Sequence, residues 1–142
     1  MVRKRIIPCL LLQNESLVKT TRFKKPSYIG DVINTVRIFN ELEVDELILL
    51  DIKATTSKTE PNFELLKDIA SECFMPLAYG GGIKNLAQAK KIIEIGFEKV
   101  IINSGAYSCN DLITQIANEL GNQCVIGSLD VKKSFLGNYF VY

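Results

Sequence analysis

Short apolar runs alternate with longer amphipathic stretches along the 142 residues of this chain. The apolar runs are rich in Ile, Leu and Val without strict polar alternation, which is typical of strands buried on both faces. The amphipathic stretches repeat their apolar positions at helical spacing. We expect strands at residues 6–12, 46–52, 75–79, 99–103 and 124–130, and helices at residues 31–42, 62–73, 86–95 and 111–120.

This alternation predicts an α/β fold with a parallel sheet, either a doubly wound open sheet or a (β/α)8 barrel. A full barrel takes about 250 residues, so five strands and four helices make a little over half of one. The strand ends favour the barrel, because their polar and glycine residues would converge on one rim. Both architectures bind ligands at that carboxyl edge of the sheet.

Two segments lie outside the alternation. Residues 13–30 form the longest connection, and we expect a loop that covers a binding site. Beyond Asp130 the sequence predicts a turn that enters another strand, and it stops at Tyr142 without a polar tail. We therefore expect one domain over residues 1–142 that is a fragment of a barrel, truncated to about five strands. Its open sheet edges predict self-association or pairing with a second chain.

The composition, 47% hydrophobic and 23% charged with a net charge of +1, is that of a soluble globular protein. No apolar run reaches the ~20 residues of a membrane span, and no signal peptide is evident, which predicts a cytoplasmic protein without a membrane anchor. The absence of histidine excludes histidine-dependent catalysis and His-ligated zinc. Acid–base chemistry would rest on carboxylates, Lys, Tyr or Cys.

The cysteines are too widely spaced for a zinc or redox motif, so we expect no metal and reduced thiols. Cys9 and Cys124 lie within apolar runs and are expected in the core, while Cys73 and Cys109 lie elsewhere. The first 25 residues hold seven basic groups against Glu15 alone, which favours an anionic ligand near this segment. Few aromatic residues accompany these charges, so we expect no nucleic-acid binding.

The strongest local signal is the triple glycine Gly80-Gly81-Gly82, between a strand and a helix. Such glycines serve either tight-turn geometry or backbone binding of an anion. Asn103 and Ser104 occupy the equivalent place one strand later, and two adjacent cradles favour a phosphate site.

Asp51 and Asp130 each close an expected strand. At the carboxyl edge these carboxylates are candidates for proton transfer or for holding substrate hydroxyls, or alternatively they cap the following loops. Arg5, Glu46 and Lys99 instead begin strands, so they would meet at the opposite rim of a closed sheet. A structural ion-pair cluster that seals a barrel floor is the alternative to a functional role there.

The collinear pattern of 4–10, 45–52, 79–83, 99–103, 112–117 and Asp130 resembles the N-terminal five-eighths of HisF, the cyclase subunit of imidazole glycerol phosphate synthase. The resemblance implies a (β/α)8 barrel that takes ammonia from a glutaminase partner of the HisH type and converts a bis-phosphorylated ribulosyl substrate in histidine biosynthesis. It implies a lyase activity without a cofactor.

The resemblance also implies roles for individual residues. Gly81, Gly82, Asn103 and Ser104 would hold a substrate phosphate, Lys19 would belong to a mobile loop over the site, and Asp51 would lie in the pocket. Asp130 would be one of two catalytic aspartates. Arg5, Glu46 and Lys99 would form part of an ammonia gate at the barrel floor, and Glu98 would contact the partner.

One residue departs from the family pattern. Leu11 stands where the family has its other catalytic aspartate, and losing one member of an acid–base pair commonly costs on the order of 10²–10⁴ in rate. The Cys9-Leu10-Leu11-Leu12 run and its neighbourhood are similar to paralogues encoded with surface-polysaccharide genes. The alternative functions are therefore a non-cyclising subunit that delivers ammonia for amidation of a sugar, as in lipopolysaccharide biosynthesis, and an incomplete barrel that only binds phosphate or assembles.

Overall fold

The parallel part of the sheet follows the order of the chain. The computed structural model describes residues 3–21, 24–108, 111–135 and 137–141. Within them a seven-stranded sheet has the order β3-β2-β1-β4-β5-β6-β7. Its parallel strands are β1 (Cys9–Gln13), β4 (Leu47–Asp51), β5 (Leu77–Gly80), β6 (Lys99–Ile102) and β7 (Val125–Gly127).

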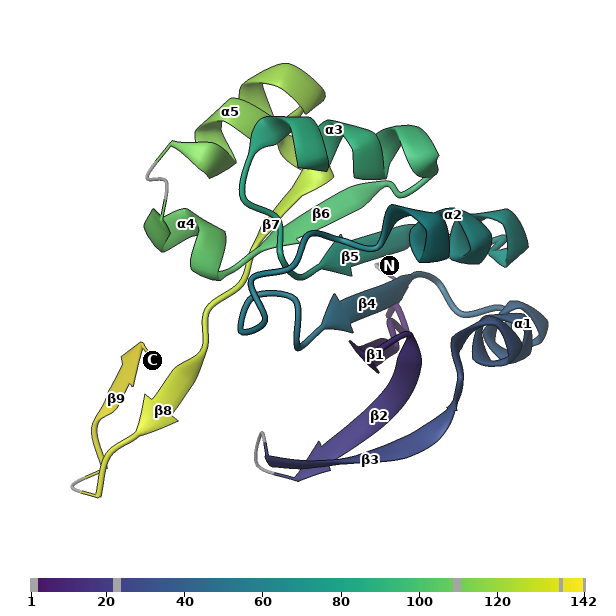
Figure 1. The fold of residues 1–142 in the computed structure, drawn as a ribbon, viewed down its shortest axis with the longest axis horizontal. Helices are drawn as coiled ribbons and strands as arrows, with labels where there is room; N and C mark the ends of the chain where they lie inside the picture. Colours follow the sequence, from purple (N-terminus) through teal and green to yellow (C-terminus); the bar gives the residue numbers. More distant parts are fainter. Residues whose placement is uncertain (1–2, 22–23, 109–110, 136, 142) are drawn as a thin grey trace.

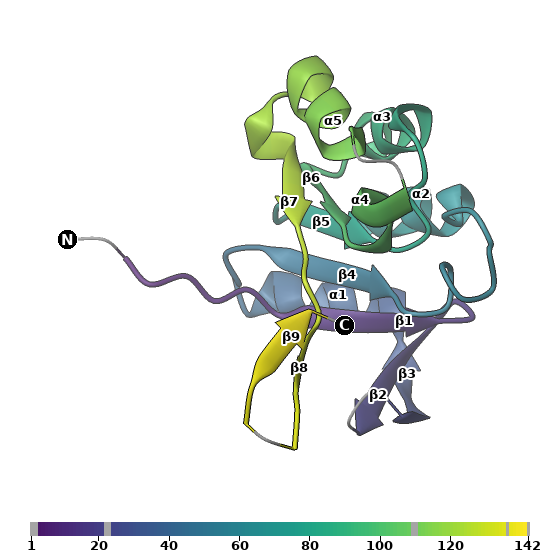
Figure 2. The ribbon, with the colours of Figure 1, turned by 90° about the vertical axis from the view of Figure 1, so that its left-hand side faces the viewer.

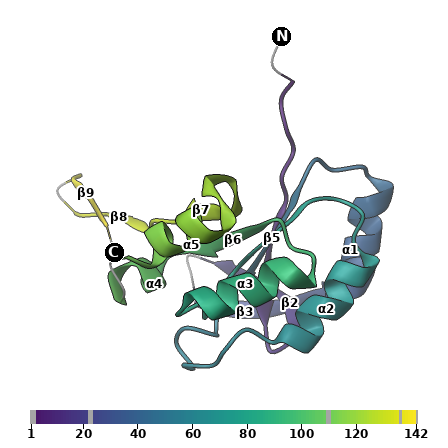
Figure 3. The ribbon, with the colours of Figure 1, turned by 90° about the horizontal axis from the view of Figure 1, so that it is seen from above.

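This sequential order decides between the two expected architectures. A doubly wound sheet reverses its strand order at a switch point and carries helices on both faces. Here each successive parallel strand is added on the same side, and the helices follow one another along one face of the sheet (Figure 1; Figure 3). The expected α/β fold with a mostly parallel sheet is confirmed, in the arrangement of part of a (β/α)8 barrel.

The four expected helices form close to their expected bounds: α1 (Val32–Glu41), α2 (Phe63–Glu72), α3 (Leu86–Ile95) and α5 (Leu112–Leu120). Side-chain oxygens of Asp31, Asn62 and Asn85 accept hydrogen bonds from backbone amides in the first turns of α1, α2 and α3. Gly96 and Gly121 end α3 and α5 with positive φ values of 125° and 100°, a conformation that glycine adopts without strain.

The core lies between these helices and the outer face of the sheet. Alternate strand residues such as Leu47, Leu49, Tyr79 and Val100 are at most 1% exposed. Tyr79 also meets Phe97 edge to face, with ring centroids 6.1 Å apart. The helices contribute the other half of the core, with Val36, Leu66, Ile69, Ile92 and Ile116 fully buried. The face of the sheet that bears residues such as Leu11 and Leu50 carries no helix, so it is left to line a pocket.

The expected loop at residues 13–30 is wrong: the segment forms an antiparallel hairpin of β2 (Ser16–Thr21) and β3 (Lys24–Asp31). Asn14 and Glu15 have φ values of 50° and 64°, and two successive positive φ values make the two-residue turn that matches strand twist. This turn joins β1 to β2 directly. Figure 2 shows the hairpin projecting from the sheet below β1.

A second hairpin follows β7, as the turn predicted beyond Asp130 suggested. It consists of β8 (Val131–Lys133) and β9 (Tyr139–Val141) and is separate from the main sheet (Figure 2). Two short elements were not expected, the α-helix α4 (Ser104–Ser108) and the 3-10 helix η1 (Asn122–Cys124). The strand expected at 124–130 is therefore shorter, because its last residues cross from β7 to the hairpin.

The core position expected for Cys9 is wrong, because this residue is exposed at the start of β1. Cys73 and Cys124 are partly buried, and all three thiols are free. Cys109 lies outside the described residues. In the described part of the chain, no helix is long and apolar enough to cross a membrane.

Candidate functional site

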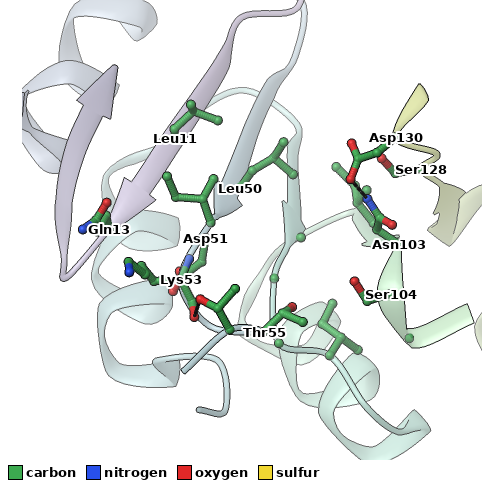
Figure 4. A pocket seen from close by; sticks show the side chains of 18 of the residues that line it. Leu11, Gln13, Leu50, Asp51, Lys53, Thr55, Asn103, Ser104, Ser128 and Asp130 are labelled. Carbon is green, nitrogen blue, oxygen red and sulfur yellow. Dashed lines mark hydrogen bonds between the residues drawn. The ribbon is translucent and has the colours of Figure 1, made fainter. Parts of the chain in front are cut away.

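A pocket of about 610 Å³ opens at the carboxyl ends of β1, β4, β5 and β6. Its wall includes all of the polar and glycine residues that we expected to converge at this edge, except Lys19. Figure 4 shows one group on the β1 and β4 side and a second group on the β6 and β7 side. The expected site residues that line it are Asp51, Gly81, Gly82, Asn103, Ser104 and Asp130.

Gly81 and Gly82 make a turn that no other residue fits. Their φ values are 131° and 69°. A Cβ at Gly81 would lie 2.6 Å from the backbone oxygen of Asp51, and one at Gly82 would lie 2.8 Å from Cβ of Ala54. The tight-turn explanation for the glycines is therefore correct as far as it goes. The Gly81-Gly82 turn also brings backbone without side chains to the pocket wall, which is the arrangement that anion binding by backbone amides needs.

Asp51 caps the loop that follows β4. Its Oδ1 accepts hydrogen bonds of 2.9 Å from the backbone amides of Lys53 and Ala54. This confirms the capping alternative for Asp51, while the side chain also lines the pocket. Burial raises the pKa of the nearby Tyr79 hydroxyl, and the negative charge of Asp51 raises it further. Tyr79 is therefore a neutral packing residue at physiological pH.

Asp130 is joined to the end of the neighbouring strand. The Asn103 side-chain amide donates a 3.0 Å hydrogen bond from Nδ2 to Oδ2 of Asp130. The Ser128 backbone amide donates a 2.9 Å hydrogen bond to the Ile102 carbonyl oxygen. This bond also holds the segment after β7 against the end of β6. Ser104 begins α4 directly beside them. Thus a carboxylate, an amide and a hydroxyl share one side of the pocket (Figure 4).

Lys19 does not line this pocket. It is an exposed residue of β2, and its carbonyl oxygen accepts a 3.4 Å hydrogen bond from Ser27 of β3. The hairpin reaches the pocket through Thr20 and Pro26 instead. Leu11 lies in the pocket wall, so the departure from the family pattern occurs inside the site (Figure 4).

Gln13 is a pocket residue that sequence reasoning missed. It stands two positions after Leu11 in β1, and the strand repeat places both side chains on the same face. Its Oε1 is buried and accepts no hydrogen bond from the described residues. The alternation from Leu11 is the available signal, but the sequence predicts that the strand ends at residue 12.

Arg5, Glu46 and Lys99 come together at the opposite rim, as their positions at strand starts predicted. Glu46 is 3% exposed. One carboxylate oxygen accepts from Arg5, and the other accepts from Lys99 Nζ at 2.5 Å. A buried carboxylate shared by two cations is a satisfied ion-pair cluster, which is the geometry expected of the structural alternative. Among the described residues, no group of three or more Cys, Asp or Glu side chains is placed to hold a metal ion.

The sequence profile of the histidine biosynthesis protein family matches residues 5–142. The chain belongs to this family. It is 56% identical over 142 residues to the imidazole glycerol phosphate synthase subunit hisF2 of Pseudomonas aeruginosa, covering all of this chain and 57% of that protein. It is 49% identical over 133 residues to the subunit hisF2 of Campylobacter jejuni, with 94% of this chain and 53% of that protein covered.

The HisF subunit of Dictyoglomus turgidum is more distant, at 39% identity over 142 residues, with all of this chain and 56% of that protein covered. These relatives place the chain in the HisF group of the histidine biosynthesis family. The chain spans about half the length of the curated relatives it matches.

Proposed function

We propose that this HisF-family chain binds a phosphorylated ribulosyl substrate at the carboxyl edge of its sheet and receives ammonia from a glutaminase partner. The observation that carries the proposal is the pocket of about 610 Å³, in which the Gly81-Gly82 turn, Asn103 and Ser104 face one cavity with Asp130. Bare backbone amides, an amide side chain and a hydroxyl are donors that suit a phosphate.

Asp130 is the group assigned to proton transfer. Its carboxylate lies on the pocket wall, and its bond from Asn103 fixes its orientation. A general base needs such a fixed position within reach of the substrate proton. Lys19 lies on β2 outside the pocket wall. Its proposed role over the site therefore requires that the hairpin move towards the pocket.

The ammonia route is assigned to the opposite rim. Arg5, Glu46 and Lys99 surround the point where ammonia would enter, and the uncovered sheet face between the two rims is largely apolar. Neutral ammonia crosses such a surface more readily than ammonium, because burying an unpaired charge is costly. The partner would contact this rim, where Glu98 is exposed before β6.

Calorimetric titration with inorganic phosphate tests the phosphate site. We expect one site in the chain, weakened by about tenfold to 100-fold in Ser104→Ala and in Asn103→Ala, because hydrogen bonds to a charged group contribute about 1.5–3 kcal/mol. The control is Ser71→Ala, which changes a hydroxyl on the exposed surface of α2. Equal affinity in all four proteins would refute the phosphate site.

Leu11 supports a second candidate function, delivery of ammonia for amidation of a sugar without cyclisation. A leucine in the pocket wall neither gives nor takes a proton. Cyclisation needs proton transfer, but the conduction of ammonia does not need a proton-transfer group at this position. Incubation of the chain with a glutaminase partner, glutamine and the ribulosyl substrate separates the two functions. Ammonia release with an unconsumed ribulosyl substrate supports the second candidate, and consumption of the substrate supports the first.

A further inference from the structure

The β1 and β4 side of the pocket includes two hydrogen-bond acceptors, the side-chain oxygens of Gln13 and Asp51. Gln13 closes β1, and Asp51 closes β4 beside it, where Leu12 and Asp51 are paired in register. Both side chains line the pocket and lie across from Asn103 and Ser104 (Figure 4). Gln13 and Asp51 are therefore placed to contact the part of a ligand that lies away from Asn103 and Ser104.

The Gln13 oxygen is the stronger of the two observations. Oε1 is buried, and no donor among the described residues reaches it. A buried acceptor without a donor costs about 1–3 kcal/mol, so native proteins rarely retain one without a purpose. A ligand hydroxyl that met this oxygen after a rotation of the Gln13 amide towards the pocket would remove that cost.

Asp51 supplies the second acceptor in a fixed orientation. Its Oδ1 is held by the amides of Lys53 and Ala54, and no hydrogen bond to Oδ2 is found from the described part of the chain. The capping bonds fix the side chain before any ligand arrives, which lowers the entropy cost of binding. The free oxygen therefore has a set position at the pocket wall.

The surroundings select for hydroxyl groups at this end. Leu11 and Leu50 form the adjacent wall and offer no competing polar group. The negative charge of Asp51 opposes a phosphate there, and the Lys53 side chain is exposed, so solvent screens its ammonium. Neutral donors are the ligand groups that match a carbonyl and a carboxylate oxygen.

We propose that Gln13 and Asp51 form an acceptor subsite for the hydroxyl groups of a phosphorylated sugar whose phosphate lies at Asn103 and Ser104. This subsite rests on the proposed function, because it takes the phosphate end from that proposal. It adds the requirement that the part of the ligand facing Gln13 and Asp51 carry neutral hydroxyl groups. The specificity of the pocket then depends on Gln13 as much as on the phosphate cradle.

Side-chain amide signals in 15N–1H NMR spectra of the whole chain test the two ends separately. Inorganic phosphate is expected to shift the Asn103 amide and to leave the Gln13 amide in place. Ribose 5-phosphate is expected to shift both. Movement of Asn103 without Gln13 in ribose 5-phosphate would overturn the subsite and keep the phosphate site, whereas an unmoved Asn103 with both probes would overturn the proposed function.

A substitution gives the corresponding change in affinity. Gln13→Met keeps the length of the side chain and removes its polar atoms, so ribose 5-phosphate should bind about threefold to tenfold more weakly, as expected for a neutral hydrogen bond. Inorganic phosphate should bind as before. Gln115→Met, on the exposed face of α5, is the matched control and should change neither affinity. Loss of both affinities, or of neither, in Gln13→Met would refute the subsite.

Discussion

Removal of the Glu46 carboxylate should destabilise the chain more than removal of the half-exposed Arg5 guanidinium. Glu46 is 3% exposed and accepts hydrogen bonds from both Arg5 and Lys99. The side chain of Lys99 is 23% exposed and that of Arg5 is 55% exposed. In Glu46→Ala, the Lys99 ammonium therefore remains partly buried without its partner.

The magnitude follows from these exposures. Leaving a buried charge unpaired costs about 3–5 kcal/mol, and partial solvent access to Lys99 reduces the figure for Glu46→Ala to about 2–4 kcal/mol. Arg5→Ala should cost no more than about 1 kcal/mol, because a half-exposed pair is screened by water and salt. Replacing Arg5, Glu46 and Lys99 together by Met, Leu and Met should be nearly neutral, because no unpaired charge remains.

Urea unfolding followed by circular dichroism measures these free energies. With an unfolding slope of about 1–3 kcal/mol per molar urea, Glu46→Ala should lower the midpoint by about 1 M or more, and Arg5→Ala by no more than about half of that. Equal midpoints for Glu46→Ala and Arg5→Ala would refute the burial argument. A triple variant as unstable as Glu46→Ala would refute the charge argument.

Three further predictions concern single positions. Gly82→Ala should destabilise the chain by at least about 1 kcal/mol in urea unfolding, because its φ is 69° and the new Cβ would meet Ala54, whereas Gly127→Ala, with open space around it, should be nearly neutral. Burial and Asp51 raise the pKa of Tyr79, so stability should be lost as the pH rises above the tyrosine pKa of the unfolded chain, and Tyr79→Phe should reduce this alkaline loss in thermal melts. Arg37 lowers the pKa of Glu72, so their pair should stabilise the fold at neutral pH and lose its effect as the pH falls through that lowered pKa; Arg37→Met should flatten this part of the pH profile.

The parallel sheet and its helices were predictable because each element carries its own signal. Apolar runs mark the strands, and Asp31, Asn62 and Asn85 cap the helices that follow. The expected bounds of α3 were correct to the residue. The strand ends also predicted that Asp51, Asn103 and Asp130 would meet, since parallel strands bring their carboxyl ends to one edge.

The turn from β1 into β2 was missed because it lacks the usual glycine. Asn14 and Glu15 both adopt positive φ, and Glu rarely marks such a turn. Most side chains of β3 are exposed, so no apolar alternation indicates a strand there. Because residues 13–30 were expected to form a loop, Gln13 was not expected to continue β1 or to line the pocket.

Burial depends on which face of the sheet a helix covers, and local patterns do not specify this. Cys9 lies in an apolar run and is nevertheless exposed, because the strand repeat places it on the same face as Leu11, whereas Leu10 and Leu12 face the core under the helices. Lys19 was expected over the site, but the next residue, Thr20, lines the pocket instead, because successive residues of β2 point to opposite faces.

The most direct test of the proposed function is ammonia-dependent turnover of the bis-phosphorylated ribulosyl substrate. The assay uses the chain joined to the C-terminal part of its Pseudomonas aeruginosa relative, with ammonium salt, beside Leu11→Asp and Asp130→Asn variants. We expect measurable turnover that Leu11→Asp raises by about 10²-fold or more and Asp130→Asn abolishes. Turnover that is unchanged in Asp130→Asn, or absent even in Leu11→Asp, would contradict the proposed function.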